Sequence, residues 1–441
     1  MDAGRLPGAS RREQVVAHVD MDCFYAACER RRDPELVGEP LVVGMGYEGG
    51  ETHGAVATAS YEAREFGVES AMAISEALER LPRRADHDED SDRELAETGY
   101  YRPVDMDHYE RVGDEVKSVL HDAAETVREV SIDEAYLDVT DRVDWDDAQR
   151  WAADLKDRIR SEVGVVASVG VAPTMSAAKV ASDRDKPDGL VVVRPGEVRE
   201  FFADLPVEEV HGVGPVTARQ LREMSVETAG DLAAADPEAL ARRFGERGRE
   251  IRRYARGEDE RAVTPKGDPK SLSRESAFTE PVEEPAEKRR KVETLAAAVA
   301  DRAHRKDARY RTIGIKVVEP PFEVNTRARS LPGPVADADL VESTALDLLE
   351  EFADAPVRKV GVRVSNLDFT AGEQASLGGF DGAGDAAAGT PADDDGDPTR
   401  DPEADDGQAE LTAFVEDGAD RADGAAADDD PDGQASLGRF D

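Results

Sequence analysis

Aromatic residues are scarce in this chain: 12 Phe, 9 Tyr and 2 Trp make up 5% of its 441 residues. Basic residues are also in deficit, with 56 Lys and Arg against 98 Asp and Glu, for a formal net charge of -42. This deficit fits an acidic protein that avoids nucleic acid, or a salt-adapted protein whose carboxylates keep the surface hydrated whatever its partner is. The shortage of aromatics and the excess of Ala, Asp and Glu favour salt adaptation. The net charge therefore does not exclude a function on DNA.

Cysteine and long apolar runs are nearly absent. The two cysteines, Cys23 and Cys28, have neither a partner arrangement typical of a disulfide framework nor the spacing of a zinc site. No apolar run approaches the ~20 residues of a membrane-spanning helix, and the first residues lack the hydrophobic core of a secretory signal. We therefore expect a cytoplasmic protein without a membrane partner, in a reducing compartment.

Strand-like and helix-like stretches alternate in mixed order up to about residue 190, which predicts an α+β domain. Residues 126–140, "TVREVSIDEAYLDVT", alternate as a hairpin with one buried face does. Residues 83–98 have the composition of a solvated acidic insertion. The length of the chain predicts further domains.

Residues 201–257 are helical throughout, and a charged connector follows them. Residues 270–369 form a second α+β pattern that is close to neutral, so its basic residues are the best placed to lie along a polyanion. From residue 370 the composition falls to Ala, Gly, Asp and Pro, which cannot bury a core and predicts disorder.

Carboxylates follow two strand-like stretches. "VDMD" contains Asp20 and Asp22, and "SIDEAYLD" contains Asp133 and Glu134. Carboxylates at the ends of neighbouring strands can converge on Mg²⁺, which prefers oxygen ligands. Two such ions would activate an attacking oxygen and stabilise a leaving one. The alternative is that these acids are ordinary surface residues, but their apolar flanks predict burial, where an unpaired carboxylate is costly.

Four motifs in order, "HVDMDCFYAACE", "GAVATASYEAREFGV", "VSIDEAYLDVT" and "SAAKVASDRDKPDGL", resemble the signatures of Y-family DNA polymerases, in particular the DinB or DNA polymerase IV branch. The resemblance runs from about Val15 to about Leu367. It implies a multidomain α+β fold, the right-hand polymerase with palm, fingers, helical thumb and little finger. The implied domains are a flexible N-terminus (1–12), palm (13–31 and 80–190), fingers (32–79), thumb with a helix-hairpin-helix (191–257), linker (258–269), little finger (270–369) and a disordered acidic tail (370–441).

The resemblance also implies roles for the acidic residues. Asp20 and Asp133 match the metal-binding carboxylates, and the backbone carbonyl of Met21 matches a further ligand. Glu134 matches the catalytic glutamate near the primer 3′-hydroxyl and also faces the metals. Two Mg²⁺ ions per active site are implied. Asp22 matches a common acidic position, where we expect a structural role through hydrogen bonds.

Nucleotide contacts are implied by the same motifs. Tyr25 matches the steric gate, whose ring leaves no room for a 2′-hydroxyl, and Phe24 is expected to pack nearby. Without the motif, an ordinary core tyrosine would be the first interpretation of Tyr25. Tyr61, Arg64 and Lys179 match residues that contact the incoming triphosphate, in keeping with the cations that phosphoryl transfer needs.

DNA contacts are expected in the last two domains. "VHGVGP" resembles the hairpin of a helix-hairpin-helix, in which Gly212 and Gly214 let backbone N–H groups approach a phosphate. A glycine turn between helices is the ordinary alternative. The backbone contacts expected in the little finger are Arg274, Arg327, Arg329, Lys359 and Arg363.

The resemblance implies a monomeric enzyme that copies primer–template DNA with deoxynucleoside triphosphates, at low fidelity, past damaged bases and without proofreading. Two other functions remain open from the residues alone. A palm-type nucleotidyl cyclase would share the carboxylates without needing a thumb or a basic little finger. A non-catalytic DNA-binding scaffold would keep those domains without needing the carboxylates.

The acidic tail repeats the pattern Q-x-x-L-x-x-F three times, as "QASLGGF", "QAELTAF" and "QASLGRF". The pattern resembles the peptide that binds sliding clamps of the PCNA type, in which Leu and Phe of one 3₁₀ turn enter an apolar pocket. Each copy lacks the usual second aromatic, so each is expected to bind weakly, and chance recurrence is the alternative. The residues concerned are Gln374, Leu377, Phe380, Gln408, Leu411, Phe414, Gln434, Leu437 and Phe440.

Overall fold

A computed structural model describes residues 13–87 and 94–369 of the chain. These residues form two compact units, with the boundary between Lys266 and Gly267. The expected flexible N-terminus and the tail with its three clamp-type motifs lie outside the described residues. No helix within the described ranges combines the length and the apolar content needed to cross a membrane.

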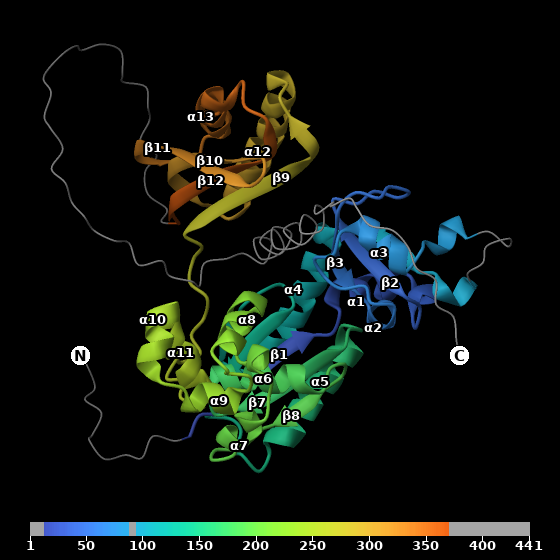
Figure 1. Cartoon of the computed structure of the whole chain (residues 1–441), viewed down its shortest axis with the longest axis vertical. Coiled ribbons are helices and arrows are strands. Elements are labelled where there is room, and N and C mark those ends of the chain that lie inside the picture. Colours follow the sequence, from blue (N-terminus) through green and yellow to red (C-terminus); the bar gives the residue numbers. More distant parts are fainter. Residues whose placement is uncertain (1–12, 88–93, 370–441) are drawn as a thin grey trace, which may run out of the picture. The chain divides into compact units, whose positions relative to one another are not determined.

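A five-stranded sheet forms the centre of the first unit (Figure 1). In spatial order its strands are β5 (Thr126–Glu129), β6 (Glu134–Asp138), β1 (Val16–Met21), β7 (Ala167–Ala172) and β8 (Leu190–Val192). The helices around it are α1 (Phe24–Arg32), α4 (Met106–Ala123), α5 (Ala148–Glu162) and α6 (Met175–Arg184). The predicted hairpin is confirmed, because β5 and β6 pair antiparallel.

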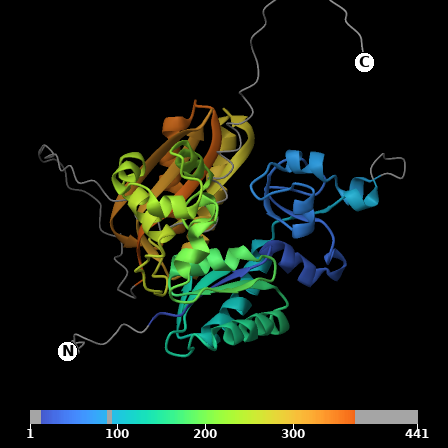
Figure 2. The ribbon, with the colours of Figure 1, turned by 60° about the horizontal axis from the view of Figure 1, so that its bottom comes forward.

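The central strand β1 sends alternate side chains into two different layers, as a strand must. Its odd-numbered residues, from Ala17 to Met21, are buried in a core with α4 and α5. Val16, on the other face, is buried with α6. Figure 2 shows these helical layers on opposite sides of the sheet. His18 and Asp20 share the face of Val16, so the strand directs both toward the layer of α6.

A smaller sheet follows the first helix. Its spatial order is β3-β2-β4. β4 pairs parallel to β2, so this sheet includes residues up to Pro103. The elements are β2 (Leu41–Met45), β3 (Ala55–Ala59), α2 (Tyr61–Glu65), α3 (Ile74–Arg80) and β4 (Tyr100–Pro103).

The composition of segment 83–98 predicted a solvated insertion, but parts of the segment are packed against the protein. Arg84 donates a hydrogen bond to Glu39 at 2.7 Å, and Thr98 is 1% exposed. Arg83 lies over the ring of Tyr47 at 5.5 Å. Both ends of the segment are thus fixed to the small sheet, and its most acidic residues, 88–93, lie outside the described ranges.

The last part of the first unit is helical, as expected. The first residues of the expected linker pack against this unit. Asp259 has a side chain 1% exposed, accepts the backbone N–H of Ser176 at 3.0 Å and pairs with Arg261 at 3.0 Å. Val263 is also buried. The first residues of the expected linker are therefore hydrogen-bonded to the N-terminus of α6. The helices are α7 (Val198–Ala203), α8 (Pro215–Glu223), α9 (Ala229–Ala234), α10 (Pro237–Phe244) and α11 (Glu246–Ala255).

The second unit is a four-stranded antiparallel sheet with two helices on one face (Figure 1). Its order is β11-β10-β12-β9, and each neighbouring pair runs antiparallel. The elements are β9 (Ser271–Val282), α12 (Pro285–Arg305), β10 (Arg309–Glu319), β11 (Glu323–Val335), α13 (Ala338–Leu349) and β12 (Val357–Asp368).

Lys288 of α12 is fully buried in this unit. Its ammonium donates hydrogen bonds to the carbonyls of Phe352, Ala353 and Ala355 at 2.9, 2.6 and 2.9 Å. These carbonyls follow α13, where a chain leaving a helix has no intrahelical donors. One lysine thus satisfies the C-terminal end of the neighbouring helical segment.

We expect Lys288→Met to lower the free energy of unfolding of the second unit by about 1–3 kcal/mol, because buried carbonyls lose their donor. Hydrogen exchange of amides in this unit is the suitable measurement, since Trp145 and Trp151 both lie in the first unit. Arg289→Met is the matched control. It breaks an exposed ion pair to Glu350 and should cost less than about 1 kcal/mol. Equal losses in both variants would contradict the capping role.

Candidate active site

The three predicted carboxylates meet where β1 and β6 lie side by side. Asp20 stands directly opposite Glu134 in the antiparallel register. The backbone N–H of Met21 donates to the carbonyl of Asp133 at 2.9 Å, which ties the residue before β6 to the end of β1. Residues more than a hundred positions apart are thereby fixed against each other by backbone pairing.

Two lysines pair with Asp20 and Glu134. Lys179 Nζ lies 2.9 Å from Asp20 Oδ2 and 3.2 Å from Glu134 Oε2. Lys186 Nζ lies 2.7 Å from Asp20 Oδ1, and Asp183 pairs with both lysines at 3.4 and 2.8 Å. The side chains of Asp20 and Glu134 are 13% and 21% exposed. Charges at that depth are tolerated because each one is paired.

The lysines also decide the charge state of the cluster. Burial alone would raise the pKa of Asp20, but the ammonium groups of Lys179 and Lys186 outweigh burial and hold it below its ordinary value. Burial likewise opposes ionisation of Glu134, yet His18 and Lys179 lower its pKa to about 2. Both carboxylates are therefore ionised at neutral pH.

Asp133 has the opposite balance. Burial raises its pKa to about 6, the negative charges of Asp20 and Glu134 add to the rise, and a hydrogen bond from Ser131 Oγ at 2.6 Å opposes it. A cation close to this carboxylate would favour its ionised form. Among the interactions that set its pKa, the Asp133 carboxylate thus has no cation to balance its negative charge.

The donor atoms fit a hard divalent cation. His18, Asp20 and Glu134 each offer a ligand atom, and these atoms lie within 4.8 Å of one another. Asp133 adds a further carboxylate beside them. Carboxylate oxygens are the protein ligands that Mg²⁺ accepts. The two ammonium groups among them show that positive charge is favoured at this place.

Tyr25 lies at the start of α1 with its ring fixed. The rings of Tyr25 and Tyr109 are stacked, with centroids 4.6 Å apart and planes at 16°. Phe24 is buried beside it, at 6.1 Å between centroids. Burial raises the pKa of Tyr25 to about 12, and the negative charge of Asp133 adds to this. The phenol is therefore neutral, and its ring cannot swing freely.

Asp22 joins the small sheet to the large one. Its carboxylate accepts hydrogen bonds from Tyr61 Oη at 3.3 Å, Ser168 Oγ at 2.9 Å and the backbone N–H of Asp188 at 2.7 Å. The guanidinium of Arg64 lies 4.9 Å from the centre of the Tyr61 ring. Asp22 thus has the hydrogen-bonding role expected of it, and it holds Tyr61, whose ring lies under the guanidinium of Arg64.

The predicted glycine hairpin stands between the helical turn at Val207–Glu209 and α8. Gly212 has φ +83°, a backbone conformation that residues with a side chain rarely adopt, and a Cβ there would also displace the guanidinium of Arg247. Its carbonyl accepts a hydrogen bond from Arg247 at 2.9 Å. Gly214 precedes Pro215, the first residue of α8, which leaves the start of this helix free of side-chain bulk.

The five basic residues predicted in the second unit divide between two faces of its sheet. Residues opposite each other in antiparallel strands share a face. Lys359 and Arg363 pair with Val318 and Gly314, on the face away from the helices. The other three pair with core residues on the helix-covered face; these are Arg274, Arg327 and Arg329.

Three of these five residues are engaged by acids of the same unit. Arg327 donates to both carboxylate oxygens of Glu351, and Arg329 pairs with Asp347 at 3.1 Å. On the open face, Lys359 Nζ lies 2.7 Å from Glu275. Arg363 is exposed. The open face is therefore the more accessible of the two for an anionic partner.

Three residues of the site were not identified from the sequence. His18, Ser182 and Asp183 belong to the cluster, and Lys186 contacts Asp20 directly. His18 is 0% exposed, with Nδ1 2.8 Å from Ser182 Oγ, and burial lowers its pKa. The two-residue period of a strand already put His18 on the face of Asp20 and was the available signal.

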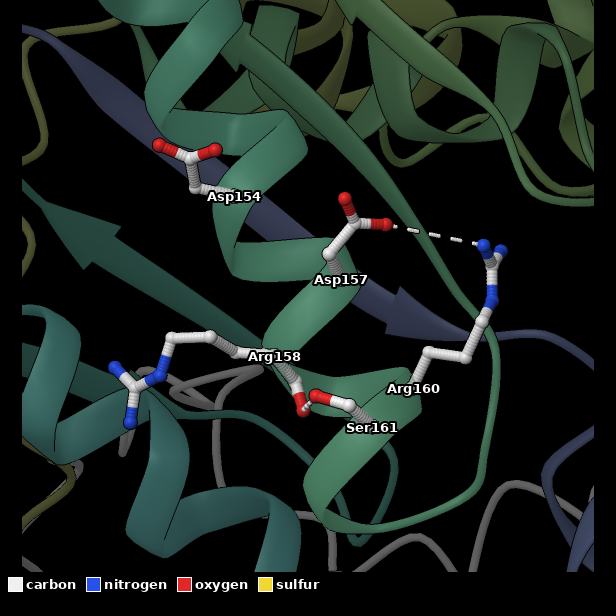
Figure 3. Close-up of a pocket in the computed structure, with 5 residues that line it drawn as sticks. All are labelled: Asp154, Asp157, Arg158, Arg160 and Ser161. Atoms are coloured by element: carbon white, nitrogen blue, oxygen red, sulfur yellow. Dashed lines mark hydrogen bonds and ion pairs between the residues drawn. The ribbon is translucent and has the colours of Figure 1, made fainter.

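A hollow on the outer side of α5 is lined by charged residues (Figure 3). Most of its charges are paired on the same helix: Asp157 pairs with Arg160 at 3.9 Å, and Arg158 pairs with Glu162 at 3.0 Å. Ser161 donates to the carbonyl of Arg158. The hollow contains none of the residues predicted to act in chemistry, and we do not regard it as the active site.

Three family models match the chain. The impB/mucB/samB family model matches residues 19–183, the C-terminal domain of the same family matches 269–377, and its helix-hairpin-helix motif matches 195–224. DNA polymerase IV of Halobacterium salinarum is 62% identical over 87% of this chain and 92% of its own length. DNA polymerase IV of Methanoculleus marisnigri is 40% identical over 83% of this chain and 98% of its own.

Solved structures agree with these relatives. A Y-family DNA polymerase chimera, Dbh-Dpo4(243-245)-Dbh, superposes with a TM-score of 0.70 at 28% identity, over 81% of this chain and all of the other. An insertion ternary complex of Dbh DNA polymerase matches with a TM-score of 0.58 at 27% identity, over 81% of this chain and all of the other.

Proposed function

Because the chain belongs to the impB/mucB/samB family, the Y-family DNA polymerases of the DNA polymerase IV (DinB) branch, we propose that it extends a primer by two-metal phosphoryl transfer at the cluster around Asp20. DNA-directed DNA polymerase activity and translesion synthesis are the functions of this family. The observation that carries the mechanism is the pairing of Asp20 and Glu134 across β1 and β6, with Lys179 bonded to both.

Asp20, Asp133, Glu134 and the backbone carbonyl of Met21 are the groups that would hold two Mg²⁺ ions. The ions would supply Lewis-acid stabilisation of charge on the phosphates and on the reacting oxygens. The donor chemistry supports this assignment, because the cluster consists of ionised or ionisable carboxylates that already attract two ammonium groups.

The cationic side chains of the site would bind the triphosphate. Lys179 lies among the carboxylates. Tyr61, beside the small sheet, donates a hydrogen bond to Asp22, and Arg64 lies over the Tyr61 ring. Placing a phosphate in line and neutralising its charge is most of what phosphoryl transfer requires. Glu134, ionised at neutral pH, would accept a hydrogen bond from the primer 3′-hydroxyl and orient it.

Tyr25 would select deoxynucleotides. Its ring stacks on Tyr109, which is itself anchored by a hydrogen bond from its hydroxyl to Glu29 at 2.8 Å. A ring supported in this way does not yield to a 2′-hydroxyl on the sugar. Selection would then depend on the ring and not on the phenolic hydroxyl.

The primer–template would be held by backbone contacts. Gly212 and Gly214 would approach a phosphate at the thumb, and Arg363 would do so on the open face of the little finger. Lys359, on the same face, would first have to exchange Glu275 for a phosphate. Arg274 would reach a phosphate from the edge strand β9. Arg327 and Arg329 could do the same only by exchanging Glu351 and Asp347 for phosphates.

We further propose synthesis without proofreading and recruitment by a sliding clamp through the tail motifs. Affinity that depends on Lys and Arg falls steeply with salt. A tether restores a high local concentration at the primer end, and several weak copies add avidity. The motifs lie outside the described residues, so their support is the sequence pattern alone.

Primer extension on a template, assayed across salt concentrations, tests the activity and its mechanism. Asp20→Ala and Glu134→Ala should each reduce single-nucleotide insertion by about a hundredfold or more, a loss typical of removing one group that stabilises transition-state charge. Glu125→Ala is the control, since this exposed carboxylate lies beside the same hairpin and should leave the rate unchanged. Wild-type-like extension by both site variants would overturn the mechanism.

Tyr25→Ala should raise ribonucleotide incorporation relative to deoxynucleotide incorporation by about tenfold or more, since the pocket then accommodates the extra hydroxyl. The ratio of kcat/KM values for the two nucleotides is the measurement. Tyr25→Phe retains the ring and should discriminate as the wild type does. A loss of discrimination in Tyr25→Phe would show that the hydroxyl, and not the ring, carries selection.

Deletion of residues 371–441 should leave synthesis without a clamp unchanged and abolish stimulation by a PCNA-type clamp. The comparison is the ratio of rates with and without clamp on a primed circular template. Replacing Gln434, Leu437 and Phe440 by Ala tests the last copy alone and should give a partial loss, because the other copies remain. Undiminished stimulation of the deleted protein would refute recruitment by the tail.

A further inference from the structure

His18 stands between two parts of the active site and has no role in the mechanism above. Its side chain is 0% exposed. On one side Nδ1 lies 2.8 Å from Ser182 Oγ of α6, and on the other Nε2 lies 3.5 Å from Glu134 Oε2 of β6. Nε2 is a buried nitrogen without a hydrogen-bond partner among the described residues.

The packing around the ring leaves it one orientation. Gly170 is opposite His18 in β7, and a Cβ there would come 2.1 Å from the carbonyl oxygen of Ala178 and 2.3 Å from the backbone nitrogen of Ser182. The missing side chain thus lets α6 lie directly on the sheet, which brings Ser182 to the imidazole. Tyr136, opposite in β6, covers the ring with centroids 4.5 Å apart.

The hydrogens of this arrangement follow from the acceptors. A neutral imidazole has one N–H and one lone pair, and an ionised carboxylate can only accept. With the hydrogen on Nδ1, the lone pair of Nε2 would face Glu134 in a buried site, which is unfavourable. With the hydrogen on Nε2, the ring donates to Glu134, and the hydroxyl of Ser182 donates to Nδ1.

The second arrangement leaves no group of α6 unsatisfied. In the structure the hydroxyl of Ser182 donates to the carbonyl of Lys179 at 2.7 Å, so it would have to turn away from this carbonyl to donate to Nδ1. Within a helix that carbonyl already accepts the N–H four residues on, so the hydroxyl is free to turn to the imidazole. The 3.5 Å from Nε2 to Glu134 is long for a hydrogen bond, and such bonds shorten when a substrate complex forms.

We propose that His18 is a positioning residue, whose Nε2–H holds the Glu134 carboxylate toward Asp20 and Lys179 while Ser182 fixes the tautomer. The inference rests on the proposed role of Glu134. The two ring nitrogens then have separate roles: Nδ1 contacts Ser182 of α6, and Nε2 orients the Glu134 carboxylate. Replacing one edge at a time separates the two contributions.

Asn and Gln substitutions replace one edge each. His18→Asn can present an amide at the position of Nδ1 and keep the contact with Ser182, but it does not reach Glu134. His18→Gln extends to the position of Nε2 and can donate to Glu134. We expect His18→Asn to lower kcat of single-nucleotide insertion by about 10- to 100-fold, as loss of a group that orients a ligand or catalytic side chain does, with KM for the nucleotide near the wild-type value. His18→Gln should keep most of kcat.

A spectroscopic measurement tests the tautomer without relying on activity. The chain has 7 histidines, so the protein labelled with ¹⁵N-histidine gives few ring signals, and His18 is assigned by the signals lost in His18→Gln. Wild-type protein should show a bare Nδ1 and a protonated Nε2. Ser182→Ala should shift this population toward the other tautomer. A wild-type ring protonated at Nδ1 and bare at Nε2 would overturn the proposal, even if both His18 variants failed to fold.

Equal kcat values for folded His18→Asn and His18→Gln would also overturn it, since orientation of Glu134 would then not matter. Glu134→Ala in the same assay separates this failure from failure of the proposed mechanism. Wild-type activity in Glu134→Ala would refute the role of Glu134 itself. An inactive Glu134→Ala beside a fully active His18→Asn would refute only the inference about His18.

Discussion

The ion pairing of Lys179 with Asp20 and Glu134 is the interaction on which the site depends. Two carboxylates at 13% and 21% exposure would repel each other across paired strands. The ammonium of Lys179 lies between them, and it lowers the pKa of both after burial has opposed ionisation. The strands β1 and β6 can therefore end in facing acids without separating. The same charge balance keeps the cluster ionised and ready to receive cations and phosphates.

Helix α6 brings most of this together, because it carries Lys179, Ser182 and Asp183 in adjacent turns. Its close approach to the sheet depends on Gly170, and its first turn is fixed by Asp259, which accepts the N–H of Ser176. Asp259 lies where the chain leaves the first unit. The start of the helix that carries Lys179 is therefore held by a residue that follows the last helix of the first unit.

The sequence predicted what local patterns determine. Alternation in residues 126–140 gave the hairpin, and apolar flanks around Asp20 gave a strand with a buried carboxylate. Strand register between distant segments has no such signal. The parallel pairing of β4 with β2 and the helix-covered face of Arg327 therefore came only from the structure. His18 lies between these cases, since its face could be predicted while its partner on α6 could not.

The acidic composition limits how strongly the proposed DNA contacts can attract a phosphate. In the second unit the acids lie among the bases: Glu275 pairs with Lys359, and Glu351 pairs with Arg327. A phosphate must compete with these carboxylates, so part of the attraction that basic residues would give is already used. Exposed ion pairs contribute little by themselves, and salt weakens both kinds of contact. An enzyme of this kind gains little from stronger basic patches, which gives a physical reason for binding energy that does not depend on charge, such as apolar Leu and Phe anchors on a tail.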